Sequence, residues 1–134
     1  MNETKASGGM AIPVTYYFID SYLSTLRYLE GLPIETVYSG HWPTMDGEEF
    51  HDFIDESRRT VERFDQVILE ALRKNPNGLN LRQLIDVVSQ SAGEWPAESN
   101  DLAMFPVHGH MTRLEEMGRV AVRQGESHQY WQLT

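Results

Sequence analysis

The spacing of apolar positions predicts a long amphipathic helix in the middle of the chain. Asp46 and Glu49 form a capping-box pattern at its start, and Asn75-Pro76 marks its end. Between them, a stripe recurs at alternating steps of four and three residues over about seven turns. The stripe consists of Phe50, Ile54, Ser57, Val61, Phe64, Ile68 and Ala71. Phe53, Val67 and Leu72 widen it. Such a broad stripe favours packing within the chain's own domain, with a coiled-coil seam as the alternative.

Two shorter helices and a hairpin are predicted after it. Asn80 and Gln83 form a second capping pair ahead of an apolar face made by Leu81, Leu84, Ile85 and Val88. After the loop SAGEWPAESND, a third helix is expected from about Leu102 to Met117, with Pro106 tolerated only in its first turn. Its inward positions are Val107, Met111, Leu114 and Met117. In residues 119–123 and 128–133, apolar and polar positions alternate on either side of residues 124–127, as in a β-hairpin. Three helices followed by a hairpin predict a winged-helix domain at 46–134.

The pattern before residue 46 predicts a separate β-α-β segment at 13–45, after a flexible polar lead-in at 1–12. Val14 to Ile19 is rich in β-branched and aromatic residues, which favour a strand. Asp20 is expected to cap a helix that ends at Gly31 and whose apolar stripe is Tyr22, Leu26 and Leu29. A second strand is expected at Ile34 to Ser39. The predicted fold class is therefore α+β.

The composition of the chain limits the classes of partner that it is expected to bind. The net charge of −9 opposes binding to nucleic acid or to an anionic membrane. No apolar run approaches the roughly 18 residues that span a bilayer, and the first residues do not resemble a secretory signal. The absence of cysteine excludes disulfides and thiolate metal sites and fits a reducing compartment, so a cytoplasmic location is expected.

The predicted third helix is poorly suited to DNA. Its only basic residue from Asp101 to Met117 is Arg113, and the hairpin adds Arg119 and Arg123 beside Glu126. A typical DNA-binding protein makes roughly six to ten phosphate contacts, which two or three arginines cannot easily supply. A packing or self-associating interaction module is therefore favoured, and a winged-helix DNA-binding regulator is the alternative.

Of the five histidines, His41 is the candidate metal ligand. His108 and His110 are two positions apart on a predicted helix and so point in different directions. His51 and His128 are expected to be solvated. His41 follows a predicted strand at a glycine, where a turn can direct an imidazole into a cleft. A catalytic zinc needs three protein ligands, so one histidine does not make a site.

Two parts of the chain resemble the metallo-β-lactamase-fold hydrolases. The helix Tyr22-Leu-Ser-Thr-Leu-Arg-Tyr-Leu29 and the turn Ser39-Gly-His-Trp-Pro43 resemble the family's Y-L-x-S-L-x-x-L helix and G-H-G-P turn. Residues 110–115, 118–120 and 130 resemble the winged-helix tail of some members. The resemblance implies that His41 is the last ligand of a dinuclear site for zinc or another divalent metal. Trp42 replaces the usual glycine of the turn, and Thr25 replaces the usual serine of the helix.

The family's main metal motif, H-x-H-x-D-H, does not occur in these 134 residues. The resemblance therefore implies the C-terminal portion of a metal-dependent hydrolase, with the catalytic half elsewhere and its winged helix shaping the cleft or mediating oligomerisation. We expect neither activity nor tight metal binding from this chain alone. We also expect a homo-oligomer, because two strands with open edges and a helix face of Tyr22, Leu26 and Leu29 would lack partners. The alternative is a monomer in which residues 1–43 are largely disordered.

Overall fold

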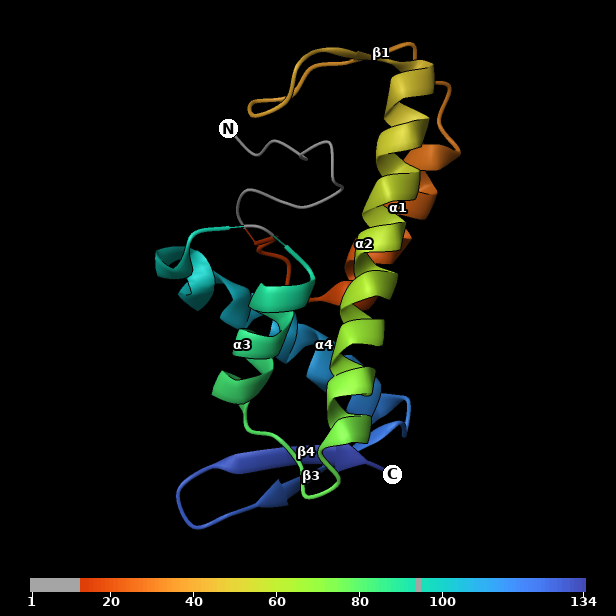
Figure 1. Cartoon of the computed structure of the whole chain (residues 1–134). Helices are drawn as coiled ribbons and strands as arrows, with labels where there is room; N and C mark the ends of the chain where they lie inside the picture. Colours follow the sequence, from red (N-terminus) through yellow and green to blue (C-terminus); the bar gives the residue numbers. More distant parts are fainter. Residues whose placement is uncertain (1–12, 94) are drawn as a thin grey trace.

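The computed structural model describes residues 13–93 and 95–134, so the lead-in expected at 1–12 lies outside the described residues. Within the described ranges, four α-helices, one 3₁₀ helix and two two-stranded antiparallel sheets form an α+β fold (Figure 1). No helix in this part of the chain has both the length and the apolar content needed to cross a bilayer.

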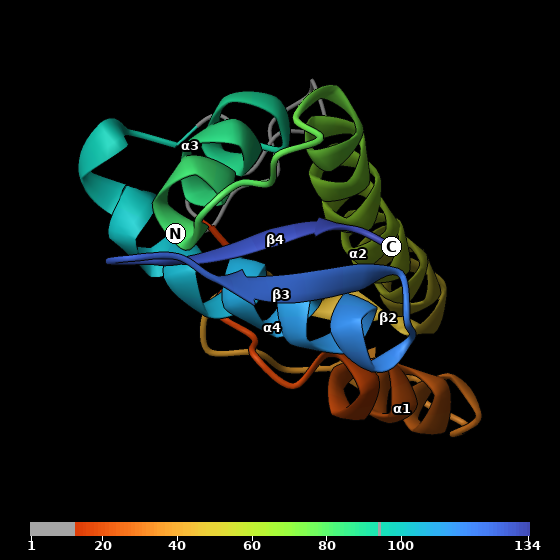
Figure 2. The ribbon, with the colours of Figure 1, turned by 90° about the horizontal axis from the view of Figure 1, so that it is seen from below.

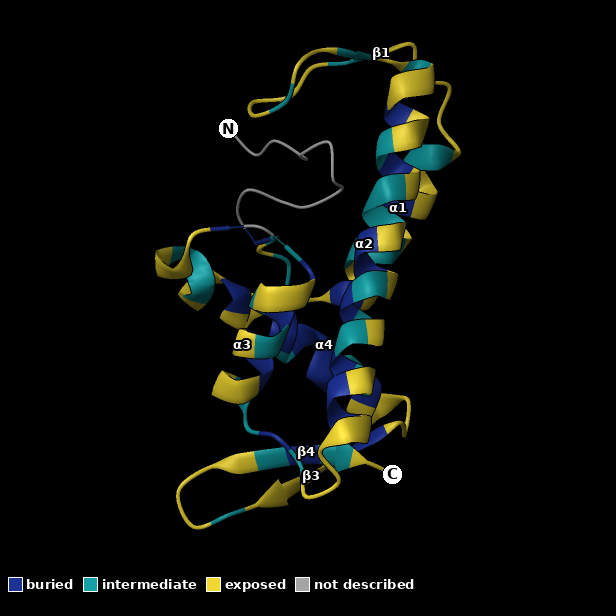
Figure 3. Cartoon of the chain, viewed as in Figure 1, coloured by how far each residue is buried: buried dark blue, intermediate teal, exposed yellow. Residues whose placement is uncertain are grey.

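The long helix is confirmed as α2, Gly47–Lys74. Asp46 accepts a hydrogen bond from the backbone N–H of Glu49, and the Glu49 side chain accepts one in return, as the capping-box pattern predicted. Six of the seven stripe residues are buried, and Ser57 is half-buried. They face other parts of the same chain, as Figure 3 shows along the lower half of α2. The stripe therefore packs within the molecule and does not form a coiled-coil seam.

The first half of α2 packs against α1, Ile19–Glu30. Leu26 of α1 is buried with Phe50 and Ile54 of α2, and Tyr22 and Leu29 pack against this cluster. The expectation that the apolar face of α1 would lack a packing partner is therefore wrong, because α2 extends far enough to cover it.

The second half of α2 packs against α3, Leu81–Ser91, and α4, Met104–Glu116. The Asn80–Gln83 capping box is present, and α4 begins so that Pro106 lies in its first turn, as expected. Val107, Met111 and Leu114 are fully buried. Two details differ from the prediction. The expected loop continues into a 3₁₀ helix η1, Ala97–Ala103, and Met117 is exposed because α4 ends one residue before it.

The predicted hairpin is confirmed as β3, Val120–Gln124, paired with β4, Gln129–Leu133. Figure 2 shows it lying across the ends of α2, α3 and α4. Val120 and Trp131 are buried from one face of the hairpin, which closes the core below these helices. Leu79, between α2 and α3, exchanges two backbone hydrogen bonds with Trp131 of β4 (3.0 and 2.9 Å).

The strand predicted at Val14 to Ile19 is absent, because Ile19 already belongs to α1 and residues 13–18 pair with no strand. Two of their aromatic side chains, Tyr16 and Tyr17, instead contact histidines of α4. These contacts give the tyrosines a half-buried environment, which is what aromatic residues also find in strands. The predicted N-cap is also wrong. Phe18 occupies that position without a side-chain cap, and Asp20 lies in the first turn, where it pairs with Arg113.

The second predicted strand is shorter than expected and pairs differently. It is reduced to β1, Thr36–Val37, which pairs antiparallel with β2, Met45–Asp46 (Figure 1). Residues 13–45 therefore form an extended segment, a helix and the start of a hairpin, and the β-α-β prediction is wrong. The sequence pattern missed β2 because it lies directly against the helix cap of α2.

Candidate functional site

The structure places His41 in the exposed loop between β1 and β2. Two contacts give this loop a defined shape. The hydroxyl oxygen of Ser39 accepts hydrogen bonds from the backbone N–H groups of His41 and Trp42 at 3.3 and 3.4 Å. The Trp42 ring packs edge-on against Phe53 of α2, with centroids 5.5 Å apart. The loop is thus fastened to the helix on one side of His41.

The described residues do not surround His41 with further ligands. Within 13–93 and 95–134, no group of three or more His, Cys, Asp or Glu side chains is placed to hold a metal ion. A stable zinc site takes three or four protein ligands. The residues present therefore do not by themselves fit a metal centre, and His41 supplies at most one ligand to an ion held elsewhere.

The other histidines lie apart from this loop. His51 and His128 are exposed, as expected, and the His128 ring lies 2.7 Å from the Ser127 hydroxyl. The two histidines of α4 contact different tyrosines of the segment before α1. His108 lies 3.3 Å from the Tyr17 hydroxyl, and His110 lies 2.8 Å from the Tyr16 hydroxyl. The two imidazoles thus bind to different tyrosines and do not converge on one site.

His110 is the centre of a polar chain, running from the buried interior to the surface, that we call the His110 network. It consists of Tyr16, His110, Asp65, Arg113 and Asp20. The fully buried His110 ring reaches Tyr16 through Nε2 and Asp65 through Nδ1, the latter at 2.7 Å. The second carboxylate oxygen of Asp65 accepts a hydrogen bond from Arg113 at 2.9 Å, and Arg113 also donates to Asp20 at 2.9 Å. The network ties the segment before α1, α1, α2 and α4 together.

The protonation of Tyr16 sets the direction of the hydrogen bonds in this network. Burial raises the pKa of the Tyr16 hydroxyl above its ordinary value of 10.0, and the nearby Tyr22 and Asp65 raise it further against the opposing effect of Arg113. Tyr16 therefore remains a hydrogen-bond donor at neutral pH. Its hydroxyl can donate to Nε2 of His110, which leaves the proton on Nδ1 to be donated to Asp65.

A tyrosine, an imidazole and a carboxylate in series are chemically able to relay a proton, but here the imidazole is closed to solvent. Each of its two nitrogens already has a protein partner. The arrangement therefore acts as an anchor for the segment before α1 and leaves no position at His110 for a reactant.

Sequence reasoning missed the His110 network, although one signal for it was present. Gly109 lies inside α4, where glycine is otherwise unfavourable and often marks a close backbone approach. A Cβ built at this position would lie 2.1 Å from the carbonyl oxygen of Tyr17. The glycine thus lets residues 13–18 cross α4 closely enough for both tyrosines to reach their histidines.

No family model matches the chain, and no curated protein matches it. The motifs quoted above, together with the geometry of the His41 loop, are therefore the basis for a functional proposal.

Proposed function

We propose that this chain is the C-terminal, non-catalytic portion of a metal-dependent hydrolase of the metallo-β-lactamase fold. In this proposal His41 is one ligand of a divalent metal, zinc or a chemical equivalent, whose other ligands come from residues outside this chain. Residues 46–134 are a winged helix that forms a wall of the substrate cleft or mediates self-association. The chain alone is not catalytically competent.

The observation that carries this proposal is the outward presentation of His41 by a fastened loop. Ser39 orders the backbone of the turn, and Trp42 holds it to Phe53, while the imidazole itself is exposed. Contacts of this kind also occur in loops without a function, but they give the turn the fixed shape that a metal ligand requires. A ligand for an external ion must be held in a fixed orientation.

Exposed aromatic side chains in the N-terminal part of the described chain support the same proposal. Phe18, Tyr28 and Tyr38 are 74%, 68% and 83% exposed, and they lie before α1, on α1 and after β1. Large exposed apolar side chains can mark a surface that contacts another protein part. The catalytic half of the proposed hydrolase is the part that would cover them.

The winged-helix assignment is supported by the order α2, α3, α4 and hairpin, with Leu79 bonded to Trp131 as a third strand-like element beside β3 and β4. DNA binding is the second candidate function, and a contact that the sequence did not predict weighs against it. Arg113 is the only basic residue of α4, and its guanidinium already donates to Asp20 and Asp65. It is therefore not free to bind phosphate.

In the intact enzyme His41 would hold one position of the metal, and the chemistry that the metal would supply is hydrolytic, with an ester, thioester, lactone, amide or phosphodiester as the substrate class. The contribution of this chain would be to hold one imidazole at the metal and to exclude water on one side of the cleft. The substrate would be selected largely by loops outside these residues.

The experiment that tests the proposal starts from the natural reading frame. The coding sequence upstream of residue 1 is examined for H-x-H-x-D-H, and the extended polypeptide is produced as wild type, His41→Ala and His51→Ala. His51 is the matched control because it is an exposed histidine on α2. We expect bound divalent metal and esterase or phosphodiesterase activity in the wild type and the control, and a loss of both in His41→Ala. An upstream sequence without the motif, or unchanged metal content in His41→Ala, would contradict the proposal.

A second measurement uses the present chain. Calorimetry with zinc is expected to detect no tight site, because one imidazole supplies too few ligands. A submicromolar zinc site that disappears in His41→Ala would show that the chain binds metal independently and would contradict the division of ligands proposed here.

A further inference from the structure

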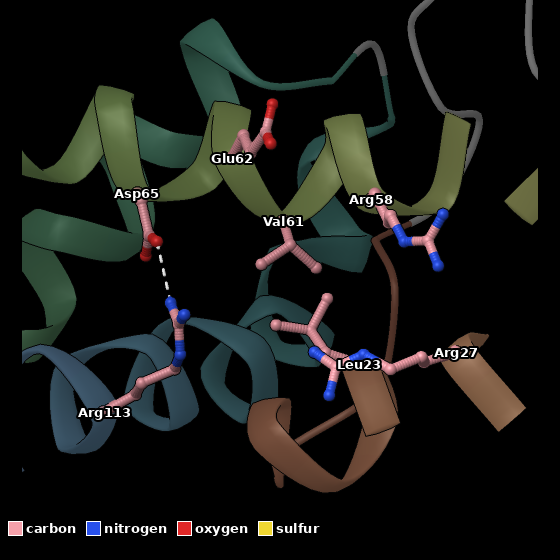
Figure 4. Close-up of a pocket in the computed structure, with 7 residues that line it drawn as sticks. All are labelled: Leu23, Arg27, Arg58, Val61, Glu62, Asp65 and Arg113. Atoms are coloured by element: carbon pink, nitrogen blue, oxygen red, sulfur yellow. Dashed lines mark hydrogen bonds and ion pairs between the residues drawn. The ribbon is translucent and has the colours of Figure 1, made fainter. Parts of the chain in front are cut away.

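A cavity of about 230 Å³ lies where α1, α2 and α4 meet (Figure 4). It is separate from the β1–β2 loop and contains no part of the proposed metal site. It is smaller than the roughly 300–1,000 Å³ of pockets that hold drug-sized molecules. Any ligand must therefore be small.

One side of the cavity is apolar. In Figure 4 the side chains of Leu23 from α1 and Val61 from α2 point toward each other across the space between the two helices. Leu23 is half-buried and Val61 is only 3% exposed, so Leu23 supplies most of the apolar surface against which a short hydrocarbon chain would be removed from water.

Three arginines also line the cavity, and two of them are neutralised by carboxylates of the same chain. Arg58 donates to both carboxylate oxygens of Glu30, at 3.0 and 2.5 Å. Arg113 donates to Asp20 and Asp65, each at 2.9 Å. These two guanidinium groups therefore have little free capacity for an added anion.

Arg27 differs from the other two. Among the residues that the structure describes, its side chain makes no hydrogen bond or ion pair, although it lines the same cavity from α1. Glu62 is the other charged lining residue without an ion pair in the described part of the chain, and Figure 4 shows its carboxylate on the side of α2 turned away from α1. The charge of Arg27 acts on Glu30 only through space and is the smallest of the influences that lower the pKa of that carboxyl group. Among the described residues that line the cavity, Arg27 is therefore the cation that no hydrogen bond or ion pair holds in place.

We propose that this cavity binds a small monocarboxylate with a short apolar tail. The carboxylate pairs with the guanidinium of Arg27, whose planar fork matches it with two parallel hydrogen bonds. The tail lies against Leu23. A phosphate dianion is disfavoured, because it has no apolar tail to place against Leu23. The inference does not depend on the proposed metal site and holds or fails separately from it.

The test is a methyl-detected NMR titration of the full chain with three probes: butyrate, inorganic phosphate and 1-butanol. Butyrate is expected to shift the methyl signals of Leu23 and Val61 in a saturable way, with a dissociation constant on the order of 1 mM. Phosphate should not saturate these shifts, because it lacks a tail. Butanol should not saturate them either, because it lacks the carboxylate.

Two variants that each lose one positive charge distinguish a specific ion pair between Arg27 and butyrate from a general effect of the charge of the protein. Arg27→Gln is expected to weaken butyrate binding about tenfold or more, since hydrogen bonds to charged groups are among the stronger ones. Arg119→Gln removes an exposed charge after α4 and should leave binding unchanged. Equal weakening in both variants, saturation by phosphate or butanol as strong as that by butyrate, or no saturable shift in tens of millimolar butyrate would each overturn the proposal. The backbone NMR spectrum of each variant verifies that it is folded.

Discussion

At the scale of single residues, the imidazole of His110 shows why its neighbours are difficult to replace. It is completely buried, and both of its nitrogens are hydrogen-bonded. A buried polar atom that loses its partner incurs the desolvation penalty without compensation, and this penalty exceeds the net gain of an ordinary hydrogen bond. Removing one partner of His110 therefore costs more than the bond itself contributes.

This asymmetry gives a prediction for Tyr16. Tyr16→Phe keeps the ring and removes only the hydroxyl, so that Nε2 of His110 loses its partner. We expect the free energy of unfolding, measured by urea denaturation, to fall by about 1–3 kcal/mol. Tyr28→Phe is the matched control, because its ring is 68% exposed and its hydroxyl is solvated, and it should change stability little. An equal effect of both variants would show that the Tyr16 hydroxyl has no special role.

The sequence could offer His41 as a candidate ligand, which stays a prediction, but it could not indicate the His110 network, for a physical reason. His41 belongs to a short contiguous motif, whereas the partners of His110 are 94 and 45 residues away along the chain. No local periodicity encodes a contact between such distant positions. The glycine between the two histidines of α4 indicated only that some backbone passes close by, without specifying which one.

At the scale of elements, prediction succeeded where the determining interactions are local. Both capping boxes lie within four residues, and the stripe of α2 repeats over its whole length, so α2, α3 and the hairpin could be predicted. Residues 14–19 were misassigned because β-propensity describes a half-buried environment more than a backbone shape. Here α4 supplies that environment, and the segment needs no strand partner.

The C-terminal end of α4 gives a second prediction. Gly118 has a φ of +72°, and the N–H groups of Gly118 and Arg119 donate to the carbonyls of Glu115 and Leu114, as in a Schellman motif. Nothing lies within 4 Å of a Cβ built there, so Gly118→Ala introduces only the backbone penalty of a left-handed conformation. We expect a loss of about 1–2 kcal/mol in thermal or urea unfolding.

The control for this substitution is Gly40→Ala. This glycine also has open space around a built Cβ, but it is not among the positive-φ glycines. The substitution should leave stability unchanged or raise it slightly, because alanine restricts the unfolded chain more than glycine does. Similar losses in both variants would contradict a conformational cause at Gly118.

The packing of α1 on α2 gives a third prediction, which concerns pH. The hydrogen bond from Arg58 holds the pKa of Glu30 below its ordinary value of 4.5. A carboxyl group with a lowered folded-state pKa contributes stability that is present above 4.5 and is lost as the pH falls through the lowered value. Glu30→Gln should therefore be less stable than wild type at neutral pH, and the difference should vanish in acid. The measurement is urea denaturation across this range of pH.

Glu35→Gln provides the comparison, because Glu35 is exposed and forms no ion pair in the described part of the chain. Its stability difference from wild type should be small and independent of pH. A Glu30→Gln difference that persists at the most acidic pH would mean that the glutamine disturbs packing, and that the ion pair with Arg58 is not the cause.

At the scale of the whole molecule, the surface around α1 gives a prediction about self-association. The face of α1 that was expected to be open is covered by α2, so the original argument from an unpacked helix does not hold. The exposed rings of Phe18, Tyr28 and Tyr38 remain, together with the two-residue strands β1 and β2, which have no further strand partner within the described residues. Burying these groups against another copy would remove apolar surface from water.

We therefore predict that the isolated chain self-associates. Light scattering at micromolar concentration should give a mass above the 15.4 kDa of a single chain. The double variant Phe18→Ser/Tyr28→Ser removes two of the exposed rings and should shift the mass toward 15.4 kDa without unfolding, because neither side chain belongs to a buried cluster.

The control Leu102→Ser/Met104→Ser alters two exposed apolar residues near the junction of η1 and α4, far along the chain from α1, and should leave the mass unchanged. A wild-type mass of 15.4 kDa with a folded α1 would show that the aromatic surface does not bind a second copy. In that case the catalytic half of the proposed hydrolase would be the better candidate to cover it.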